Sequence, residues 1–119
     1  MAAPNIVNVA TIIGKSATIA LSSTSATAIV SNAASSGKVF KINMIQIANV
    51  DGTNAADITI SLYSQDDIGG TAYALASTIS VPADTTLVVL DKNTAVYLEE
   101  NRSIGAKASV ANDLVVICS

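Results

Sequence analysis

Residues 77–109 read STISVPADTTLVVLDKNTAVYLEENRSIGAKAS, and this stretch decides the fold class. Its apolar runs are short, and each is followed by polar residues typical of a turn. Pro82 ends the first run because proline has no N–H to donate to a neighbouring strand. The same alternation of run and turn predicts three further strands, at 87–90, 95–98 and 103–109. Short β-branched runs spaced by turns in this way are typical of an antiparallel sandwich or barrel.

The rest of the chain continues this pattern. Residues 15–21 alternate between apolar and small polar side chains, which indicates a half-buried strand. A helix over residues 26–31 is an alternative, but serine and threonine side chains compete for backbone hydrogen bonds and favour a strand. The other strands that the pattern predicts are 5–13, 38–49, 57–64, 71–81 and 114–118.

The strand predicted at 38–49 is the longest and is apolar on both faces toward its middle, so we expect it at the centre of a sheet. The Asp51-Gly52 pair that follows it is a strong turn signal and predicts a hairpin with residues 57–64. We therefore expect an all-β fold. We expect residues 1–119 to form a single antiparallel β-sandwich of nine or ten short strands, either jelly-roll-like or immunoglobulin-like.

The composition bears on the partners of this domain. Of the 119 residues 13% are charged, about half the roughly 25% of an average soluble domain. Uncharged Ser, Thr and Asn, as in residues 22–36, account for part of the surface, and another part is expected to be covered by other chains in a homo-oligomer. The net charge of −3 and six scattered basic residues argue against nucleic acid as a partner. No segment approaches the roughly 18 apolar residues of a membrane helix, and the start of the chain lacks the basic leader of a signal peptide. We expect assembly in a cytoplasm and no membrane association.

Catalytic chemistry has few candidates in this chain. It contains no histidine and a single cysteine, Cys118, so one chain cannot form a Cys-His nucleophile or a Cys/His metal site. Cys118 ends an apolar run and is expected in the core. The pairs Asp66-Asp67 and Glu99-Glu100 are sequence neighbours whose side chains diverge, which suits solvated turns better than an acid–base pair. We predict that the protein is not an enzyme and assign no catalytic, cofactor-binding or metal-binding residue.

Two binding alternatives remain in the sequence. Residues 51–54 with Asp57 offer oxygen ligands for calcium, but they lack the EF-hand spacing, and a plain turn is the preferred interpretation. Tyr63, Tyr73 and Tyr97 could stack on sugar rings, but each lies in or beside an apolar strand, so half-buried packing is the expectation. Exposed and clustered tyrosines would instead favour a glycan-binding module.

Three segments carry a resemblance to a known family: 36–64, 76–104 and 108–119. Their motifs are Asn-Val-Asp-Gly, Val-Pro-Ala-Asp, Tyr-Leu-Glu-Glu and Ala-Asn-Asp-Leu, and they resemble small virion proteins of tailed bacteriophages of the marine cyanophage type. The chain departs from the family pattern in having Asn101-Arg102 where a Gly-Asp turn is expected, and asparagine tolerates the positive φ of such a turn. It also ends at Ser119 where the family pattern leads us to expect an acidic tail.

The resemblance implies a non-enzymatic structural protein of a virion. Its partners would be major capsid subunits, as a head decoration or cement protein, or neck and tail subunits, as an accessory protein. A host-surface glycan-binding module on a fibre is a second possibility, and a pilus-like filament subunit is a third. In the filament, residues 5–13 would pair with a neighbouring copy by donor-strand exchange.

Overall fold

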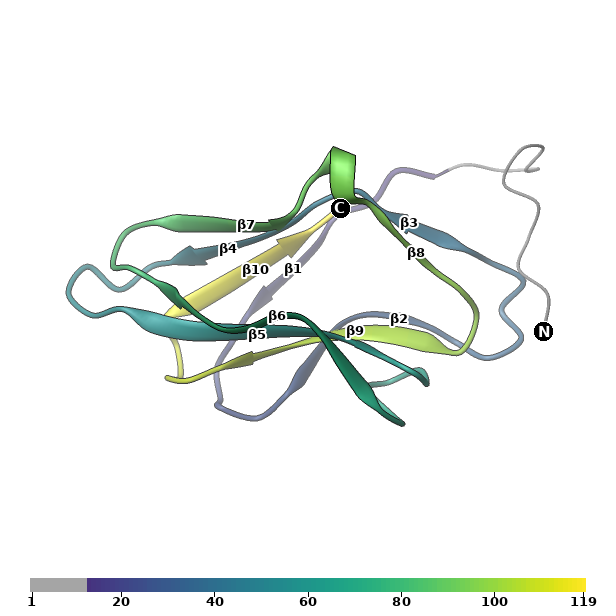
Figure 1. Cartoon of the computed structure of the whole chain (residues 1–119), viewed down its shortest axis with the longest axis horizontal. Helices are drawn as coiled ribbons and strands as arrows, with labels where there is room; N and C mark the ends of the chain where they lie inside the picture. Colours follow the sequence, from purple (N-terminus) through teal and green to yellow (C-terminus); the bar gives the residue numbers. More distant parts are fainter. Residues whose placement is uncertain (1–12) are drawn as a thin grey trace.

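The computed structural model describes residues 13–119, and its regular secondary structure consists of strands apart from one short 3-10 helix (Figure 1). Ten strands and one short 3-10 helix, η1, follow one another along the chain. Their bounds are β1 Ala17–Ala20, β2 Thr27–Asn32, β3 Phe40–Ile42, β4 Ile45–Asn49, β5 Ala56–Tyr63, β6 Ala72–Val81, β7 Thr86–Leu90, η1 Lys92–Thr94, β8 Val96–Leu98, β9 Arg102–Ala108 and β10 Leu114–Cys118.

Eight of the strands form two facing sheets. Sheet A has the order β1-β10-β4-β7, and sheet B has the order β2-β9-β5-β6. In Figure 1 the two sheets are seen edge-on as separate layers, and the remaining two strands, β3 and β8, form a ribbon at one end. The predicted all-β antiparallel sandwich is confirmed.

The strand pairing identifies the kind of sandwich. The pairs are β1 with β10, β2 with β9, β3 with β8, β4 with β7 and β5 with β6, all antiparallel. The chain is therefore one long hairpin whose tip lies between β5 and β6. Two further pairings, β10 with β4 and β5 with β9, roll this hairpin into two sheets. This is the jelly-roll arrangement, so of the two predicted sandwiches the structure has the jelly-roll-like one and not the immunoglobulin-like one.

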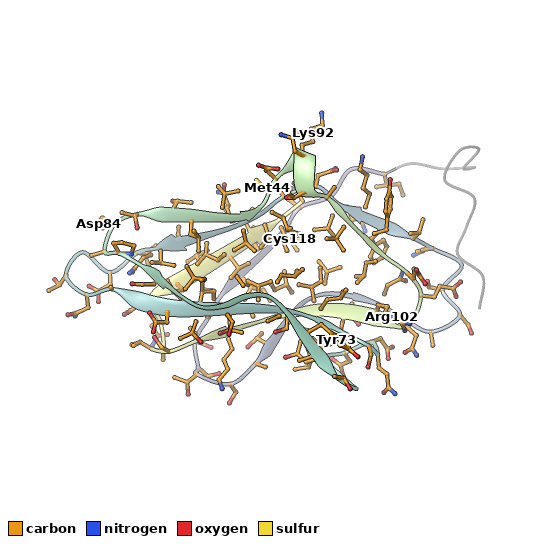
Figure 2. The ribbon with its side chains drawn as sticks, in the orientation of Figure 1. Met44, Tyr73, Asp84, Lys92, Arg102 and Cys118 are labelled. Carbon is orange, nitrogen blue, oxygen red and sulfur yellow. The ribbon has the colours of Figure 1, made fainter. Side chains whose placement is uncertain are left out.

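The core lies between the sheets and is built from aliphatic side chains. Alternate residues of the central strands point inward, as the buried Ile45 and Ile47 of β4 and the buried Leu114 and Val116 of β10 show. Cys118 is 2% exposed and lies between the layers in Figure 2, as predicted. Burial disfavours its thiolate and raises the pKa of the Cys118 thiol to about 11.

The strand predicted at 38–49 is wrong as a single element. It is broken between β3 and β4, where the backbone N–H groups of Asn43 and Met44 both donate to the carbonyl oxygen of Ser119, at 2.8 and 3.2 Å. These two bonds use N–H groups that a continuous strand would donate to a neighbouring strand. The second half, β4, does occupy a central place in sheet A, as expected.

The predicted hairpin between residues 38–49 and 57–64 is also wrong, because β4 belongs to sheet A and β5 to sheet B. A tight Asp-Gly hairpin needs positive φ at both central residues, and neither Asp51 nor Gly52 has one. Instead, the backbone N–H of Asp51 donates to Asn49 Oδ1 and that of Thr53 donates to Asp51 Oδ1, both at 2.9 Å. These side-chain turns lead the chain across from one sheet to the other.

Two buried asparagine side chains join the ends of strands to other segments by hydrogen bonds. Asn49 ends β4, and its Nδ2 donates to the carbonyl oxygens of Asn54 at 3.0 Å and Val81 at 2.9 Å. Because Val81 ends β6 of sheet B, this side chain ties the two sheets together. Asn32 ends β2 and donates in the same way to Lys38 at 2.9 Å and Leu98 at 3.0 Å.

The remaining sequence predictions concern turns and the start of the chain. Asn101 has a φ of 57°, so the expected tolerance of positive φ at this turn is confirmed. The strand predicted at 5–13 lies outside the described residues except for Ile13, which is not in a strand.

Candidate interaction surface

The outer side of sheet A is the most distinctive surface of the molecule. We call it the sheet A face. The register places its residues in two adjacent rows across the four strands. One row is Thr18, Ile117, Gln46 and Val88, and the other is Ala20, Val115, Ala48 and Thr86.

No member of the sheet A face is charged. Its aliphatic part consists of Val115 and Ile117 of β10, which are partly exposed, and Val88 of β7, which is 52% exposed. The face exists because the strands alternate: Leu114, Val116 and Cys118 point into the core, so the residues between them point outward. Depletion of charge with exposed aliphatic side chains is typical of the centre of a protein–protein interface.

The outer side of sheet B has a different character. Asp57, Thr59, Thr78 and Lys107 line a shallow pocket of about 210 Å³ there. Thr78 has a φ of 52°, where the register of β6 against β5 shifts, and its backbone N–H donates to Thr59 Oγ1 at 3.0 Å. This face is therefore polar and irregular, and an extended apolar contact is not expected on it.

The loop between β5 and β6 covers one end of sheet B. Three of its backbone N–H groups donate to side chains of other elements: Asp66 to Asn101 Oδ1, Asp67 to Ser31 Oγ and Ile68 to Ser103 Oγ, at 3.2, 2.8 and 2.8 Å. These bonds hold the loop against β2 and β9.

Gly105 of β9 makes this close approach possible. A Cβ atom at Gly105 would lie 2.8 Å from Ile68 Cγ2 and 2.9 Å from Tyr63 Cε2. The Tyr63 ring and Ile68 therefore rest on the bare backbone of β9, and the loop cannot approach as closely over any other residue.

The tyrosines differ from the expectation. Tyr63 is partly buried as predicted, but Tyr73 is 61% exposed and Tyr97 is 48% exposed. Tyr73 lies on β6, the edge strand of sheet B, and Tyr97 lies on the two-stranded ribbon, so neither ring has a neighbouring strand on every side. Tyr63 and Tyr73 line a depression of about 250 Å³ with Leu62, Ser64 and Arg102.

The calcium alternative finds no support in the described residues. Asp57 lies in β5, where its backbone N–H donates to Ser109 Oγ at 2.8 Å. Asp51 instead lies close to Asp113: desolvation and then the charge of Asp51 raise the pKa of the Asp113 carboxyl. The hydrogen bond from the Thr53 backbone lowers the pKa of Asp51. Within residues 13–119, no group of three or more acidic or cysteine side chains is placed to hold a metal ion.

The sheet A face was not identified from the sequence. Its signal was present in the outward positions of residues 114–118 and 45–49, all of which lack charge. That signal can be interpreted only when both strands are known to be neighbours in one sheet.

Among the described residues, no helix is both long and apolar enough to cross a membrane. Comparison with known proteins adds no relative, since no protein family, curated protein or solved structure matches the chain.

Proposed function

We propose that the protein is a non-enzymatic structural protein of a virion that docks on other protein subunits through the sheet A face. The observation that carries the proposal is the uncharged outer side of sheet A, in a chain whose other sheet is polar on its outer side. Burying Val88, Val115 and Ile117 against a partner would remove apolar surface from water, which drives most protein association. The jelly roll is an architecture that viral capsid and lectin domains share, and this agrees with the resemblance to phage virion proteins.

A head decoration protein is the preferred form of this role, with major capsid subunits as partners and a homo-oligomer as the assembly unit. A neck, tail or fibre accessory protein is the alternative. Copy number separates them, because a decoration protein covers the repeated capsid lattice and an accessory protein occupies few positions. Quantitative mass spectrometry of purified particles, with labelled peptides of this chain and of the major capsid protein, measures this ratio. Absence of the chain from particles would rule out the virion role.

The docking surface is tested by adding charge to the sheet A face. Val88→Lys places a cation at an exposed position, so the fold should be retained while attachment to particles is reduced. Ser80→Lys is the matched control, because it adds the same charge at an exposed position on β6 of sheet B. Co-sedimentation of each variant with particles that lack the native protein gives the bound fraction. Equal binding of the two variants would show that the sheet A face is not the docking surface.

A glycan-binding module is the second candidate function, and the exposure of Tyr73 favours it. The filament subunit has no such observation in its favour, since its donor strand would come from residues 5–13.

A further inference from the structure

We propose that the depression lined by Leu62, Tyr73 and Arg102 binds a sugar that carries a carboxylate, such as a uronic acid. We call it the Tyr/Arg depression. It lies at one end of sheet B, where Figure 2 labels Tyr73 and Arg102 near each other. This inference goes beyond the proposed docking role and does not rest on it, because the sheet A face contributes no residue to the depression.

Arg102 is held in place before any ligand arrives. Its Nη1 donates to the carbonyl oxygens of Ser64 at 2.8 Å and Asn101 at 3.0 Å. Within the described residues these are the only hydrogen bonds of its side chain, so Nε and Nη2 keep their donors for another acceptor. A guanidinium that is held through one nitrogen and keeps donors on the other two can pair with both oxygens of a carboxylate.

The charge of the depression suits an anion. Arg102 is the only charged residue among those that line it, and no acidic side chain takes part in the lining. An incoming carboxylate would therefore meet a cation without first displacing an acidic partner.

Tyr73 supplies the surface for the ring of the sugar, on the same face of sheet B as Leu62, its partner in the register. The Tyr73 ring stands exposed on the edge strand, whereas the Tyr63 ring packs over Gly105 on the other face of the sheet and does not contribute to this surface. Tyrosine combines an apolar ring face with a hydroxyl group, and so suits sugars, which have apolar C–H faces and polar edges. Because most of the Tyr73 side chain is exposed, its hydroxyl group is accessible to sugar hydroxyls.

The size of the depression limits the ligand. At about 250 Å³ it is smaller than the pockets of roughly 300–1,000 Å³ that enclose drug-sized molecules. One sugar ring is the unit that it can hold, and the open setting implies weak binding, with a dissociation constant of about 1 mM.

The test is an NMR titration of the full-length, ¹⁵N-labelled protein with methyl β-D-glucuronide. Methyl β-D-glucoside is the matched neutral ligand, since it differs only in having a CH2OH group in place of the carboxylate, and sodium acetate supplies the carboxylate without the ring. We expect the glucuronide to shift the amide signals of residues 62–64, 73 and 102, and the other two ligands to shift them far less. An equal response to the glucoside would overturn the role of the carboxylate. An equal response to acetate would overturn the role of the sugar, and no response to the glucuronide would overturn the site.

Two variants separate the site from general effects on the fold. Tyr73→Ala removes an exposed ring and should weaken glucuronide binding by about 3- to 10-fold, while Tyr97→Ala removes an exposed ring elsewhere and should leave it unchanged. Arg102→Lys keeps the charge but loses the planar pair of donors, so it should also weaken binding. Equal affinities of the Tyr73 and Tyr97 variants would refute the assignment.

Discussion

Replacing Asn49 by alanine should be among the most destabilising single changes in this fold. The side chain is 3% exposed and makes three hydrogen bonds to the backbone, two from Nδ2 and one to Oδ1. The bond to Val81 joins the end of β4 in sheet A to the end of β6 in sheet B. Alanine would leave two carbonyl oxygens and the N–H of Asp51 without their partner.

The expected cost follows from these three bonds. A buried hydrogen bond contributes about 1 kcal/mol net, and unsatisfied partners add to the loss unless water reaches them, so the Asn49→Ala change should lower the free energy of unfolding by about 3 kcal/mol. A domain of this size has a total stability of about 5–15 kcal/mol. The corresponding fall in Tm is about 10 °C.

Urea unfolding followed by circular dichroism, with a thermal melt of the same samples, measures both quantities. Asn54→Ala is the matched control: its side chain is exposed and makes only a 3.4 Å contact to Asp51, so it should change stability by less than about 0.5 kcal/mol. A loss below about 1 kcal/mol for Asn49→Ala would refute the idea that this side chain fastens the two sheets.

Three further predictions test separate features. Gly105→Ala should destabilise the protein by about 1–3 kcal/mol in urea unfolding, because its Cβ would lie within 3 Å of two side chains, whereas Gly14→Ala, with no atom within 4 Å, should be neutral. Asp113→Asn should raise the Tm at pH 7, because it removes a partly desolvated charge and its repulsion from Asp51. The gain should vanish as the pH falls through the raised pKa of Asp113, where the native carboxyl is protonated; a gain that persists at pH 2 would contradict this. Cys118 should not react with a thiol reagent at pH 8 until the protein unfolds, and rapid labelling of the folded protein would contradict its burial.

Local sequence patterns were sufficient for most of the strands in residues 13–119 but not for which strands pair with one another. The alternation in 15–21 and 57–64 and the stop at Pro82 are set by nearby residues, so these elements follow from the sequence. The partner of a strand is set by contacts between distant residues. The strand predicted at 38–49 is interrupted where Asn43 and Met44 donate hydrogen bonds to Ser119, and no sequence pattern near residue 43 predicts this contact.

Two features could be recognised only from the strand pairing: the crossing of the chain between the sheets and the exposure of Tyr73. Asp51-Gly52 is compatible with a hairpin and with a crossing between sheets, and the Asn49 side chain, bonded to Val81, belongs to the crossing. Likewise, Tyr73 occurs in an apolar run that could be a central strand. Its exposure follows from the position of β6 at the edge of sheet B, which depends on the whole topology.

The jelly roll also explains how one small chain could carry both proposed surfaces. The outer sides of sheets A and B face away from each other across a single core (Figure 1). A subunit docked through the uncharged sheet A face would keep the Tyr/Arg depression, at the end of sheet B, accessible to a ligand in solution. The two surfaces should therefore respond to substitution independently: Val88→Lys should reduce attachment and leave glucuronide binding intact, and Tyr73→Ala should do the reverse. Loss of both functions in either variant would show that the surfaces are coupled, and the separation of the two sheets would then not account for their roles.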